Sequence, residues 1–459
     1  MGPLGKINRQ LSTTQVIALG FISAILIGAV ILSLPVCSAS GKFTPFADSL
    51  FTSTTSVCVT GLVTVTTEAH WNLFGKIVIL VLIQLGGLGI VSFTTGIMMV
   101  IGRRITLRDR MLLEDALNLD TLKGLVKFLK RIFKGTFVVE GAGAVCYSFV
   151  FIPRYGIIKG IWYSVFHSIS AFCNAGIDIL GSNSLVPYAS NAWINIVTMC
   201  LVIMGGIGFL VWWDITGNIK KLIQHEYTVK MAVKKLRLHS KIVIITTFFL
   251  ITGGAVLIFA LEFNNPGTIG NMGFCNKIMA SFFQSVVLRT AGFMTFSQAN
   301  MHSTTIIVCL FIMFIGGSSI STAGGIKTTT FAVLFLSTRA TIKGSTHLVV
   351  FNKTIPHKTV QKALAVTVVS LTVLLIATFA LHLVEGGSLL DATFETTSAI
   401  ATVGLSRDFT ASMGIFGKLI ITFCMYLGRI GPISMVIFFN RQQQGSKYFS
   451  YPHEDITVG

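Results

Sequence analysis

The sequence predicts an all-α integral membrane protein built from four tandem copies of one helix–loop–helix unit. Three observations support this fold class. Of the 459 residues, 53% are hydrophobic and only 11% are charged, which a water-soluble protein of this size does not need. Long apolar runs recur along the chain, and a shorter segment that ends at a glycine lies between the members of each pair. These shorter segments recur at nearly constant spacing, which is typical of internal repeats.

Apolar runs of sufficient length define the expected transmembrane helices. About 20 helical residues are needed to cross roughly 30 Å of hydrocarbon. Such runs lie at 15–35, 76–100, 132–152, 192–216, 242–262, 303–337, 363–384 and 416–439. We therefore expect eight transmembrane helices. The first should be retained, because the short polar N-terminus leads into its apolar run without a small-residue cleavage site.

Four shorter segments, at 47–61, 162–176, 278–292 and 390–404, are expected to be re-entrant half-helices because they are too short to cross the bilayer. The stretches that begin one residue further on, at 48–62, 163–177, 279–293 and 391–405, align without gaps as DSLFTSTTSVCVTGL, YSVFHSISAFCNAGI, MASFFQSVVLRTAGF and DATFETTSAIATVGL. A phenylalanine stands ten residues before a glycine in every copy, and the pairs are Phe51 and Gly61, Phe166 and Gly176, Phe282 and Gly292, and Phe394 and Gly404. The glycines are 115, 116 and 112 residues apart.

A second set of positions confirms the same alignment within the sequence. Dipeptides stand 25, 29, 24 and 24 residues beyond the aligned glycines, and they are Gly86-Gly87, Gly205-Gly206, Gly316-Gly317 and Gly428-Arg429. Four repeats are therefore expected at 15–101, 132–216, 242–337 and 363–439. The remaining segments are the connectors 102–131, 217–241 and 338–362 and the tails 1–14 and 440–459.

The net charge of +18 is explained by membrane topology. Most lysines and arginines lie near the termini and the three connectors, and few flank the re-entrant segments. The positive-inside rule then predicts that both termini are cytoplasmic and that the re-entrant loops open to the outside. Membrane lipid headgroups are a secondary partner of these charges. Nucleic acid is not expected as a partner, because the chain has no RRM-like or zinc-finger pattern.

The eight cysteines are scattered, without a C-x-x-C pair or a histidine spacing suited to zinc. We therefore expect no disulfide framework and no metal cluster. Cys58 and Cys173 align at one position of the repeat, where packing is the simplest interpretation.

The four glycine-containing segments are candidates for an ion-selectivity filter. Irregular backbone at membrane depth is tolerated only inside protein or along a wet cavity. Four such loops around a pseudo-fourfold pore could replace the hydration shell of a cation with main-chain carbonyls. Glycine suits such a turn because a Cβ would obstruct it, and the negative C-terminal ends of the half-helices favour a cation. The candidate filter residues are Val59, Thr60, Gly61, Asn174, Ala175, Gly176, Thr290, Ala291, Gly292, Thr402, Val403 and Gly404.

Six motifs in this order carry a resemblance to a known family: IQLGGLGI (83–90), FHSISAFCNAG (166–176), RTAGF (289–293), IGGSSISTAGGIKTTTF (315–331), FETTSAIATVGL (394–405) and LGRIGP (427–432). Over essentially its whole length the chain resembles the membrane subunits of Ktr potassium-uptake systems (the KtrB and KtrD type) in the Trk/Ktr/HKT superfamily. The resemblance implies a K⁺-binding filter, a gating loop in repeat three, a homodimer in the bacterial plasma membrane, and a cytoplasmic RCK-type nucleotide-binding ring similar to KtrA and KtrC.

The segment 316–327 is the candidate gate, because it interrupts an apolar run with glycines and hydroxyl residues. A small-residue face for close helix packing is the alternative interpretation. Arg429 is a further candidate gate residue, because it is a charged side chain inside a predicted transmembrane helix. Burying such a charge costs about 2.5–3.5 kcal/mol unless the side chain is paired with an acidic residue or contacts water. Arg429 could therefore line the pore or form a structural ion pair. The candidate gate residues are Gly316, Gly317, Ser318, Ser319, Ser321, Thr322, Gly324, Gly325, Lys327 and Arg429.

Each candidate filter strand holds a single glycine, in contrast to the TVGYG sequence of tetrameric K⁺ channels. Fewer rigid carbonyl rings imply looser discrimination, so Na⁺ permeation and Na⁺ coupling both stay open. Arg289 stands inside the third strand, where a free cation would repel K⁺. We expect it to point away from the pathway and to anchor the loop to Asp391 or Glu395.

The sequence therefore predicts the ion-translocating subunit of a channel-like K⁺-uptake system, with K⁺ as the bound ion. No G-x-G-x-x-G or P-loop motif is present, so a nucleotide would bind the partner. One alternative is a Na⁺-coupled alternating-access secondary transporter for another cation, although the repeats here are parallel rather than inverted. A membrane enzyme is disfavoured, because the acidic residues inside the spans are few and dispersed.

Overall fold

The computed structural model describes residues 13–101, 105–116, 124–345 and 347–431. Helices dominate these residues, as expected for the all-α class. The predicted N-terminal tail up to residue 12, the C-terminal tail 440–459 and the last residues of the predicted final span, 432–439, lie outside the described residues, as do 102–104 and 117–123 of the first connector.

Four long helices begin the four repeats: α2 (Thr13–Ser33), α8 (Leu125–Tyr155), α13 (Leu238–Glu262) and α17 (His357–Glu385). All four are long and apolar enough to cross a membrane. Their outer faces expose large apolar side chains, among them Phe248, Phe249, Leu375 and Phe379. Such a surface suits hydrocarbon rather than water.

A shorter helix follows each long one, as the repeat predicts. These helices are α3 (Phe46–Cys58), α9 (Ile157–Phe172), α14 (Phe274–Val287) and α18 (Leu389–Ile400). In three repeats a serine of the short helix donates to a carbonyl of the long helix. The pairs are Ser53 with Ile25 at 2.7 Å, Ser168 with Glu140 at 2.6 Å, and Ser285 with Ile251 at 2.8 Å.

Two adjacent glycines of α13 provide a test of this helix contact. A Cβ on Gly254 would lie 2.5 Å from Ser285 Oγ and 2.8 Å from Ile312 Cδ1, whereas a Cβ on Gly253 would meet open space. Gly254→Ala should therefore destabilise the protein by about 1–3 kcal/mol through overpacking. The matched Gly253→Ala variant should be neutral or stabilising. Thermal unfolding of both variants in detergent measures this, and equal melting temperatures would contradict it.

The second helices of the repeats differ from the predicted straight spans. The runs 76–100 and 192–216 are each split into two helices, α5 (Leu73–Leu88) and α6 (Ile90–Val100), and α10 (Ala192–Ile207) and α11 (Phe209–Ile223). The bends are 101° and 103°. They occur at Gly89 and Gly208, whose φ values of +81° and +94° lie outside the helical region and are readily adopted only by glycine.

Repeats three and four complete the set of second helices. In repeat three, α15 (Ser303–Phe314) and α16 (Thr328–Ile342) are separated by the non-helical residues 315–327, and repeat four has α19 (Ile415–Ile430). Four described helices can span a membrane by themselves, or up to six if each bent pair counts as one span. The eight-span count therefore stays a prediction.

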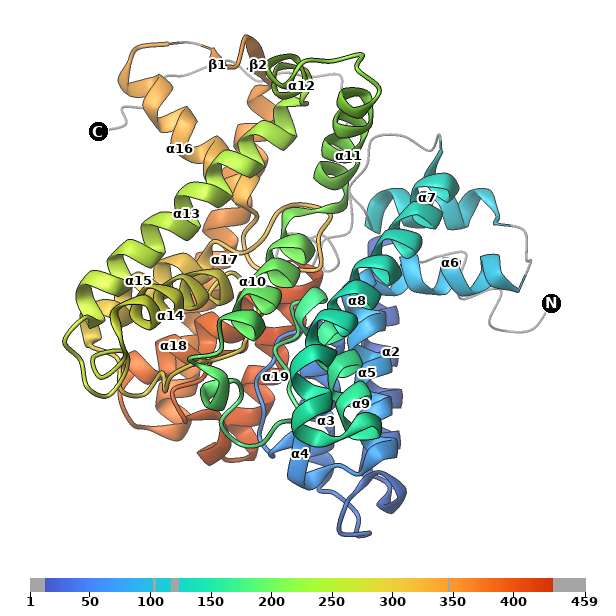
Figure 1. The fold of residues 1–459 in the computed structure, drawn as a ribbon, viewed down its shortest axis with the longest axis vertical. Helices are drawn as coiled ribbons and strands as arrows, with labels where there is room; N and C mark the ends of the chain where they lie inside the picture. The colour runs from blue at the N-terminus through green and yellow to red at the C-terminus, as the bar shows by residue number, and fades with distance from the viewer. Residues whose placement is uncertain (1–12, 102–104, 117–123, 346, 432–459) are drawn as a thin grey trace, which may run out of the picture.

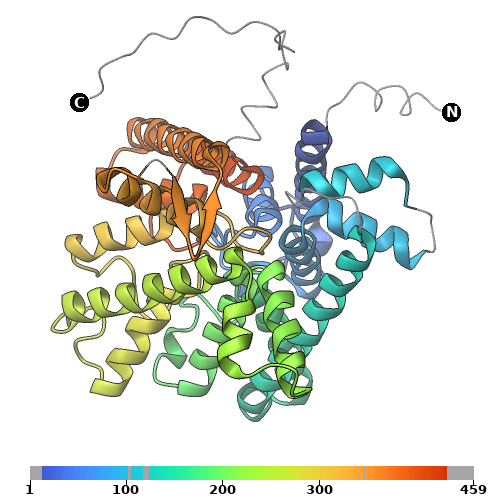
Figure 2. The same cartoon turned by 90° about the horizontal axis from the view of Figure 1, so that it is seen from above.

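The repeats follow one another around a common centre. Viewed from above, the chain colours run in order around the molecule, and the last repeat returns to the first (Figure 2). The second helix of each repeat packs against the short helix of the next one, in the pairs α5 with α9, α10 with α14, α15 with α18, and α19 with α3. An ion pair of 2.7 Å between Lys418 of α19 and Asp48 of α3 links the last repeat to the first, so the four repeats form a closed circle.

The connectors carry small elements. The helices α7 (Leu107–Ala116) and α12 (Val229–Lys235) lie in the first two connectors. The third connector forms an antiparallel hairpin of β1 (Leu348–Val350) and β2 (Lys353–Ile355), which was not predicted. Figure 1 shows α12 and the hairpin at one end of the molecule and α4 (Thr67–His70) at the other. Three 3₁₀ turns lie at Pro35–Cys37, Val186–Tyr188 and Thr410–Ser412.

Candidate ion pathway

The four aligned glycines lie together in a closed ring at the centre of the repeats. Each glycine faces the carbonyl oxygen of the residue that precedes the glycine of the next repeat. A Cβ on Gly61 would lie 2.5 Å from Ala175 O, and one on Gly292 would lie 3.0 Å from Val403 O. Gly176 faces Ala291 O in the same way, and Gly404 returns to Thr60 O. The predicted segments therefore converge on one axis.

The backbone of the four segments has positive φ at the same two positions, and it is strained at the one that is not glycine. The glycines have φ values of +102°, +65°, +69° and +90°. The residue two positions earlier is also left-handed, at Val59 (+55°), Asn174 (+59°), Thr290 (+74°) and Thr402 (+53°). A non-glycine residue in this region costs on the order of 1–3 kcal/mol and persists only where the surroundings enforce it. Its recurrence in all four repeats indicates a functional conformation.

Hydroxyl groups six residues before the glycine hold three of the segments in place. Gly61 N donates to Thr55 Oγ1 at 2.9 Å, and Gly404 N donates to Ser398 Oγ at 3.0 Å. In repeat two, Ser170 Oγ donates to Ile177 O at 2.6 Å. Repeat three has a valine at this position. We did not predict this role, although the hydroxyls align in three of the four copies.

Several polar atoms along the ring have no hydrogen-bond partner within the described protein. They are the hydroxyls of Thr60, Thr290 and Thr402 and the amide nitrogen of Asn174. All four residues are at most 1% exposed. We expect water or an ion to contact these atoms, because buried polar groups normally have partners. The oxygens available there are neutral, which suits a monovalent cation that exchanges quickly.

The glycines of the second helices allow a close approach to the ring. Gly86, Gly205 and Gly428 each face the carbonyl oxygen of the residue four positions before the ring glycine, namely Val57, Phe172 and Ile400. A Cβ would collide with this backbone oxygen in each case. Gly316 of repeat three faces Gly324 O instead, because the interrupted helix folds back on itself. In repeats one, two and four, the second set of aligned glycines is therefore explained by this close approach of a helix to a carbonyl oxygen.

The residues 316–327 lie against the segments of repeats two and four at their short-helix ends. Thr322 Oγ1 bonds to Phe172 O at 3.1 Å and to Asn174 Oδ1 at 3.0 Å. Gly324 packs against the side chain of Thr402. Backbone bonds also tie the loop to the bend of repeat two, from Ser318 N to Gly206 O at 2.9 Å and from Phe209 N to Ile320 O at 2.9 Å.

The other predicted gate residues make contacts within this loop. Ser319 Oγ lies 3.2 Å from Thr329 Oγ1, Ser321 Oγ donates to Ser318 O at 2.7 Å, and Lys327 Nζ donates to Ala323 O at 2.8 Å. Gly317 lies against Ala323, and Gly325 has a φ of +66°. The loop is thus a compact non-helical unit and not a small-residue helix face.

Arg429 joins the loop to repeat one. Its guanidinium donates to Thr322 O at 2.6 Å, to Gly86 O, and to Gly87 O at 3.4 Å. The two ion pairs formed by the described residues are Arg407 with Asp391 and Lys418 with Asp48. The described residues therefore show no ion pair between Arg429 and an acidic side chain, which was one of the two alternatives for this residue.

The prediction that Arg289 anchors its loop to Asp391 or Glu395 is wrong. Arg289 is 5% exposed, and its Nε and Nη2 atoms have no hydrogen-bond partner among the described residues. Arg407 instead pairs with Asp391, and its guanidinium also reaches the carbonyls of Gln298 and Ala299. Glu395 accepts from Arg407 N at 3.1 Å and from Thr410 Oγ1 at 2.7 Å. Arg407 thus links repeats three and four, which we did not predict.

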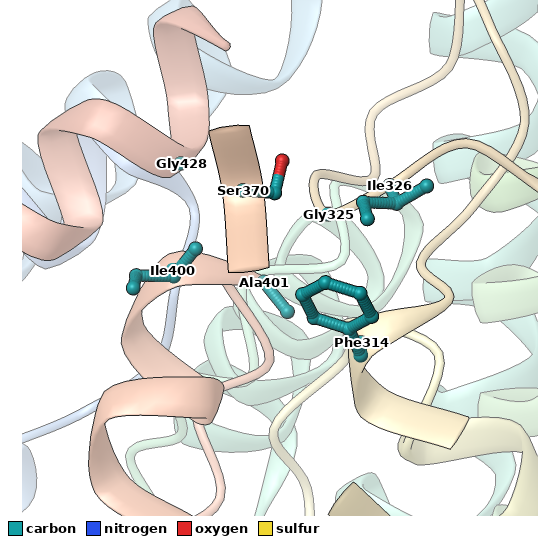
Figure 3. A pocket seen from close by; sticks show the side chains of 7 residues that line it. All are labelled: Phe314, Gly325, Ile326, Ser370, Ile400, Ala401 and Gly428. Carbon is teal, nitrogen blue, oxygen red and sulfur yellow. The ribbon is translucent and has the colours of Figure 1, made fainter. Parts of the chain in front are cut away.

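A small cavity lies between the loop and repeat four. Figure 3 shows the residues that line it, which are Phe314, Gly325, Ile326, Ser370, Ile400, Ala401 and Gly428. It has room for about one water molecule. The loop is therefore not fully packed against α17 and α19 on this side.

The apolar outer surface and the central ring of main-chain oxygens define an integral membrane protein of the cation-transporter class. Residues 11–451 match the TrkH family, described as cation transport protein. The chain belongs to this family, whose members are ion transporters and not enzymes.

Two relatives cover almost the whole chain. It is 38% identical to the potassium/sodium uptake protein NtpJ of Enterococcus hirae, over 99% of both chains. It is 39% identical to the Ktr system potassium uptake protein B of Bacillus subtilis, over 97% of this chain and 96% of the relative. The resemblance to Ktr membrane subunits seen in the sequence is therefore confirmed.

The fold is similar to the crystal structure of the potassium transporter TrkH from Vibrio parahaemolyticus. The TM-score is 0.72 at 17% sequence identity, and the match covers 94% of this chain and 86% of the other. The predicted fold class of helix–loop–helix repeats is thus confirmed.

Proposed function

We propose that this protein carries K⁺ across the bacterial plasma membrane as the ion-translocating subunit of a Ktr-type uptake system. The observation that carries the proposal is the closed ring formed by the four glycines and the carbonyls of Thr60, Ala175, Ala291 and Val403. Carbonyls in such a ring can replace the water around a cation. The names of the relatives, which are potassium uptake proteins, support K⁺ as the transported ion.

The proposal includes a gate and partners. The loop 316–327 with Arg429 would close the pathway beside the ring. A homodimer and a cytoplasmic RCK-type nucleotide-binding ring would complete the system, with both termini cytoplasmic. The term "Ktr system" in the names of relatives fits an assembly of several subunits. Na⁺ dependence is a further part of the proposal, because one relative is named a potassium/sodium uptake protein.

Complementation of a K⁺-uptake-deficient bacterium tests the proposal directly. The full chain should restore growth at micromolar K⁺ when it is expressed together with a cytoplasmic nucleotide-binding subunit. Parallel cultures without this subunit, and with or without Na⁺, separate the transport activity from its regulation. Growth no better than with an empty vector, at equal amounts of protein in the membrane, would refute the proposal.

A pH dependence follows from Asp178, which stands two residues beyond Gly176. Burial raises the pKa of Asp178 to about 6, although the N–H of Leu180 and the hydroxyl of Ser184 favour the charged form. Above this pKa the carboxylate is negative and concentrates cations at the outer mouth, and below it the charge is lost. The KM for K⁺ uptake should therefore rise by about twofold to threefold as the external pH falls from about 7.5 to 5. Asp178→Asn should show the higher KM at both pH values; a wild-type pH profile in this variant would contradict the assignment.

A further inference from the structure

Glu140 occupies a position at which two other repeats have an aliphatic residue. In repeats one, two and three, the serine of the short helix donates to the carbonyl of one residue of the long helix. That residue is Ile25 in repeat one, Glu140 in repeat two and Ile251 in repeat three. A glycine three residues later, Gly28, Gly143 or Gly254, lies against the same serine hydroxyl. The three positions are therefore equivalent, and packing of the two helices does not require a carboxyl group.

The carboxyl group of Glu140 connects two repeats. The residue is 4% exposed at the middle of α8. Gln84 Nε2 of α5 donates to Glu140 Oε2 at 3.2 Å. The thiol of Cys173 lies 3.8 Å from Glu140 Oε1 and 3.5 Å from Gln84 Oε1. The three side chains thus form a buried network between the second helix of repeat one and repeat two.

This network ends at the ring. Cys173 directly precedes the segment Asn174–Gly176, whose Ala175 carbonyl faces Gly61 of repeat one. Gly87, which is three residues beyond Gln84, is packed so tightly against Cys173 that a Cβ there would lie 2.6 Å from the sulfur. A shift of Cys173 therefore changes the distance between the carbonyls of repeats one and two.

Burying a carboxyl group at membrane depth is costly, whereas isoleucine at the equivalent positions carries no such cost. The cost is offset by the hydrogen bonds to Gln84 and Cys173. Repeat four uses a different contact, between the hydroxyls of Thr378 and Thr396 at 2.7 Å. Among the described residues, repeat two alone places a carboxyl group at this position of the helix contact.

We propose that Glu140 is a positioning residue that holds the second segment of the ring at the spacing that favours K⁺ over Na⁺. It acts by hydrogen bonding, through Cys173 and Gln84, and does not itself touch the ion. This inference rests on the proposed function, in which the ring is the selectivity filter. Coordinating groups are held in place by a surrounding shell of hydrogen bonds, and loosening that shell weakens discrimination between ions.

The test compares two substitutions in purified protein reconstituted into liposomes, with K⁺ and Na⁺ uptake measured separately. Glu140→Ile inserts the residue of repeats one and three and should lower the ratio of K⁺ to Na⁺ uptake by about tenfold, the effect that outer-shell partners of metal sites often have. Glu140→Gln retains one acceptor oxygen for the thiol of Cys173, and its amide can donate to the oxygen of Gln84 after the Gln84 amide flips, so the network can re-form and selectivity should stay within about twofold of the wild type. Wild-type selectivity in Glu140→Ile would overturn the proposal. A Glu140→Gln variant as impaired as Glu140→Ile would also overturn it, because charge and not hydrogen bonding would then be required.

Three further variants control for misfolding and for failure of the underlying function. Gln84→Leu removes the partner in repeat one and should reduce selectivity in the same direction as Glu140→Ile. Ser168→Ala removes the helix contact but leaves the carboxyl network, so it should lower stability without changing selectivity. Gly176→Ser tests the ring itself. If Gly176→Ser changes selectivity and Glu140→Ile does not, the proposal for Glu140 fails alone; if neither does, the filter assignment fails.

Discussion

Deletion of residues 318–323 is expected to raise K⁺ flux about tenfold when no regulatory subunit is present, because the open state is then no longer a minor population. The deletion removes Thr322, whose hydroxyl bonds to Phe172 O and Asn174 Oδ1 beside the ring. It also removes the carbonyl that accepts from Arg429 at 2.6 Å. The loop is also tied to the bend of repeat two, through Ser318 N to Gly206 O and Phe209 N to Ile320 O.

The measurement is K⁺ uptake into liposomes that contain the purified chain alone. Thr322→Val serves as a graded comparison, because it removes the hydroxyl contacts and keeps the bond from Arg429 to the backbone; it should raise flux less than the deletion. Thr329→Val removes only the contact with Ser319 and should leave flux near the wild-type value. Equal or lower flux after the deletion, in protein that is still folded, would show that the loop supports packing and does not gate.

The repeat and the central ring could be predicted because they depend on local chemistry that recurs. A tight turn with positive φ favours glycine, and an approach to a carbonyl oxygen too close for a Cβ requires it. Gly61 and Gly86 satisfy these two requirements in repeat one, and their counterparts stand at matching positions in the later repeats. Recurrence of the ring glycines in four copies, with the second set 24 to 29 residues beyond them, made both sets of positions visible without a structure.

The bends at Gly89 and Gly208 could not be predicted in this way. Hydropathy measures only whether a run is apolar, and both halves of each bent pair are apolar. A single glycine inside such a run is compatible with a straight helix. In repeat two the bend is fixed by a distant segment, because Phe209 N donates to Ile320 O of the loop.

Contacts between repeats were also beyond the reach of the sequence. Arg407 follows the ring glycine of repeat four and folds back onto Asp391, whereas Arg289 belongs to repeat three and forms no ion pair among the described residues. Glu140 and Gln84 are 56 residues apart and meet only when the repeats close into a ring. Tertiary packing determines which residues pair in this way, and such pairs produce no periodic pattern in the sequence.

Replacement of a ring glycine by serine should lower the K⁺ over Na⁺ preference of uptake by about tenfold, and Gly404→Ser should have the strongest effect. The added Cβ would collide with Thr60 O and would lie 2.8 Å from the Cα of Gly61. It would also have to adopt a φ of +90°, which is strained for any residue with a Cβ. Both effects displace the Thr60 carbonyl of repeat one and the backbone of repeat four, which meet where the ring closes.

Gly253→Ser is the matched control, since its Cβ meets open space on the outer face of α13 and its φ is not positive. It should leave selectivity unchanged. Competition between K⁺ and Na⁺ uptake in reconstituted protein measures the ratio for each variant. Because each of the four glycines faces a carbonyl of the next repeat, serine at Gly61, Gly176 or Gly292 should also reduce the ratio. If all four variants retained wild-type selectivity while Gly253→Ser did too, the ring could not be the site at which the protein distinguishes the two ions.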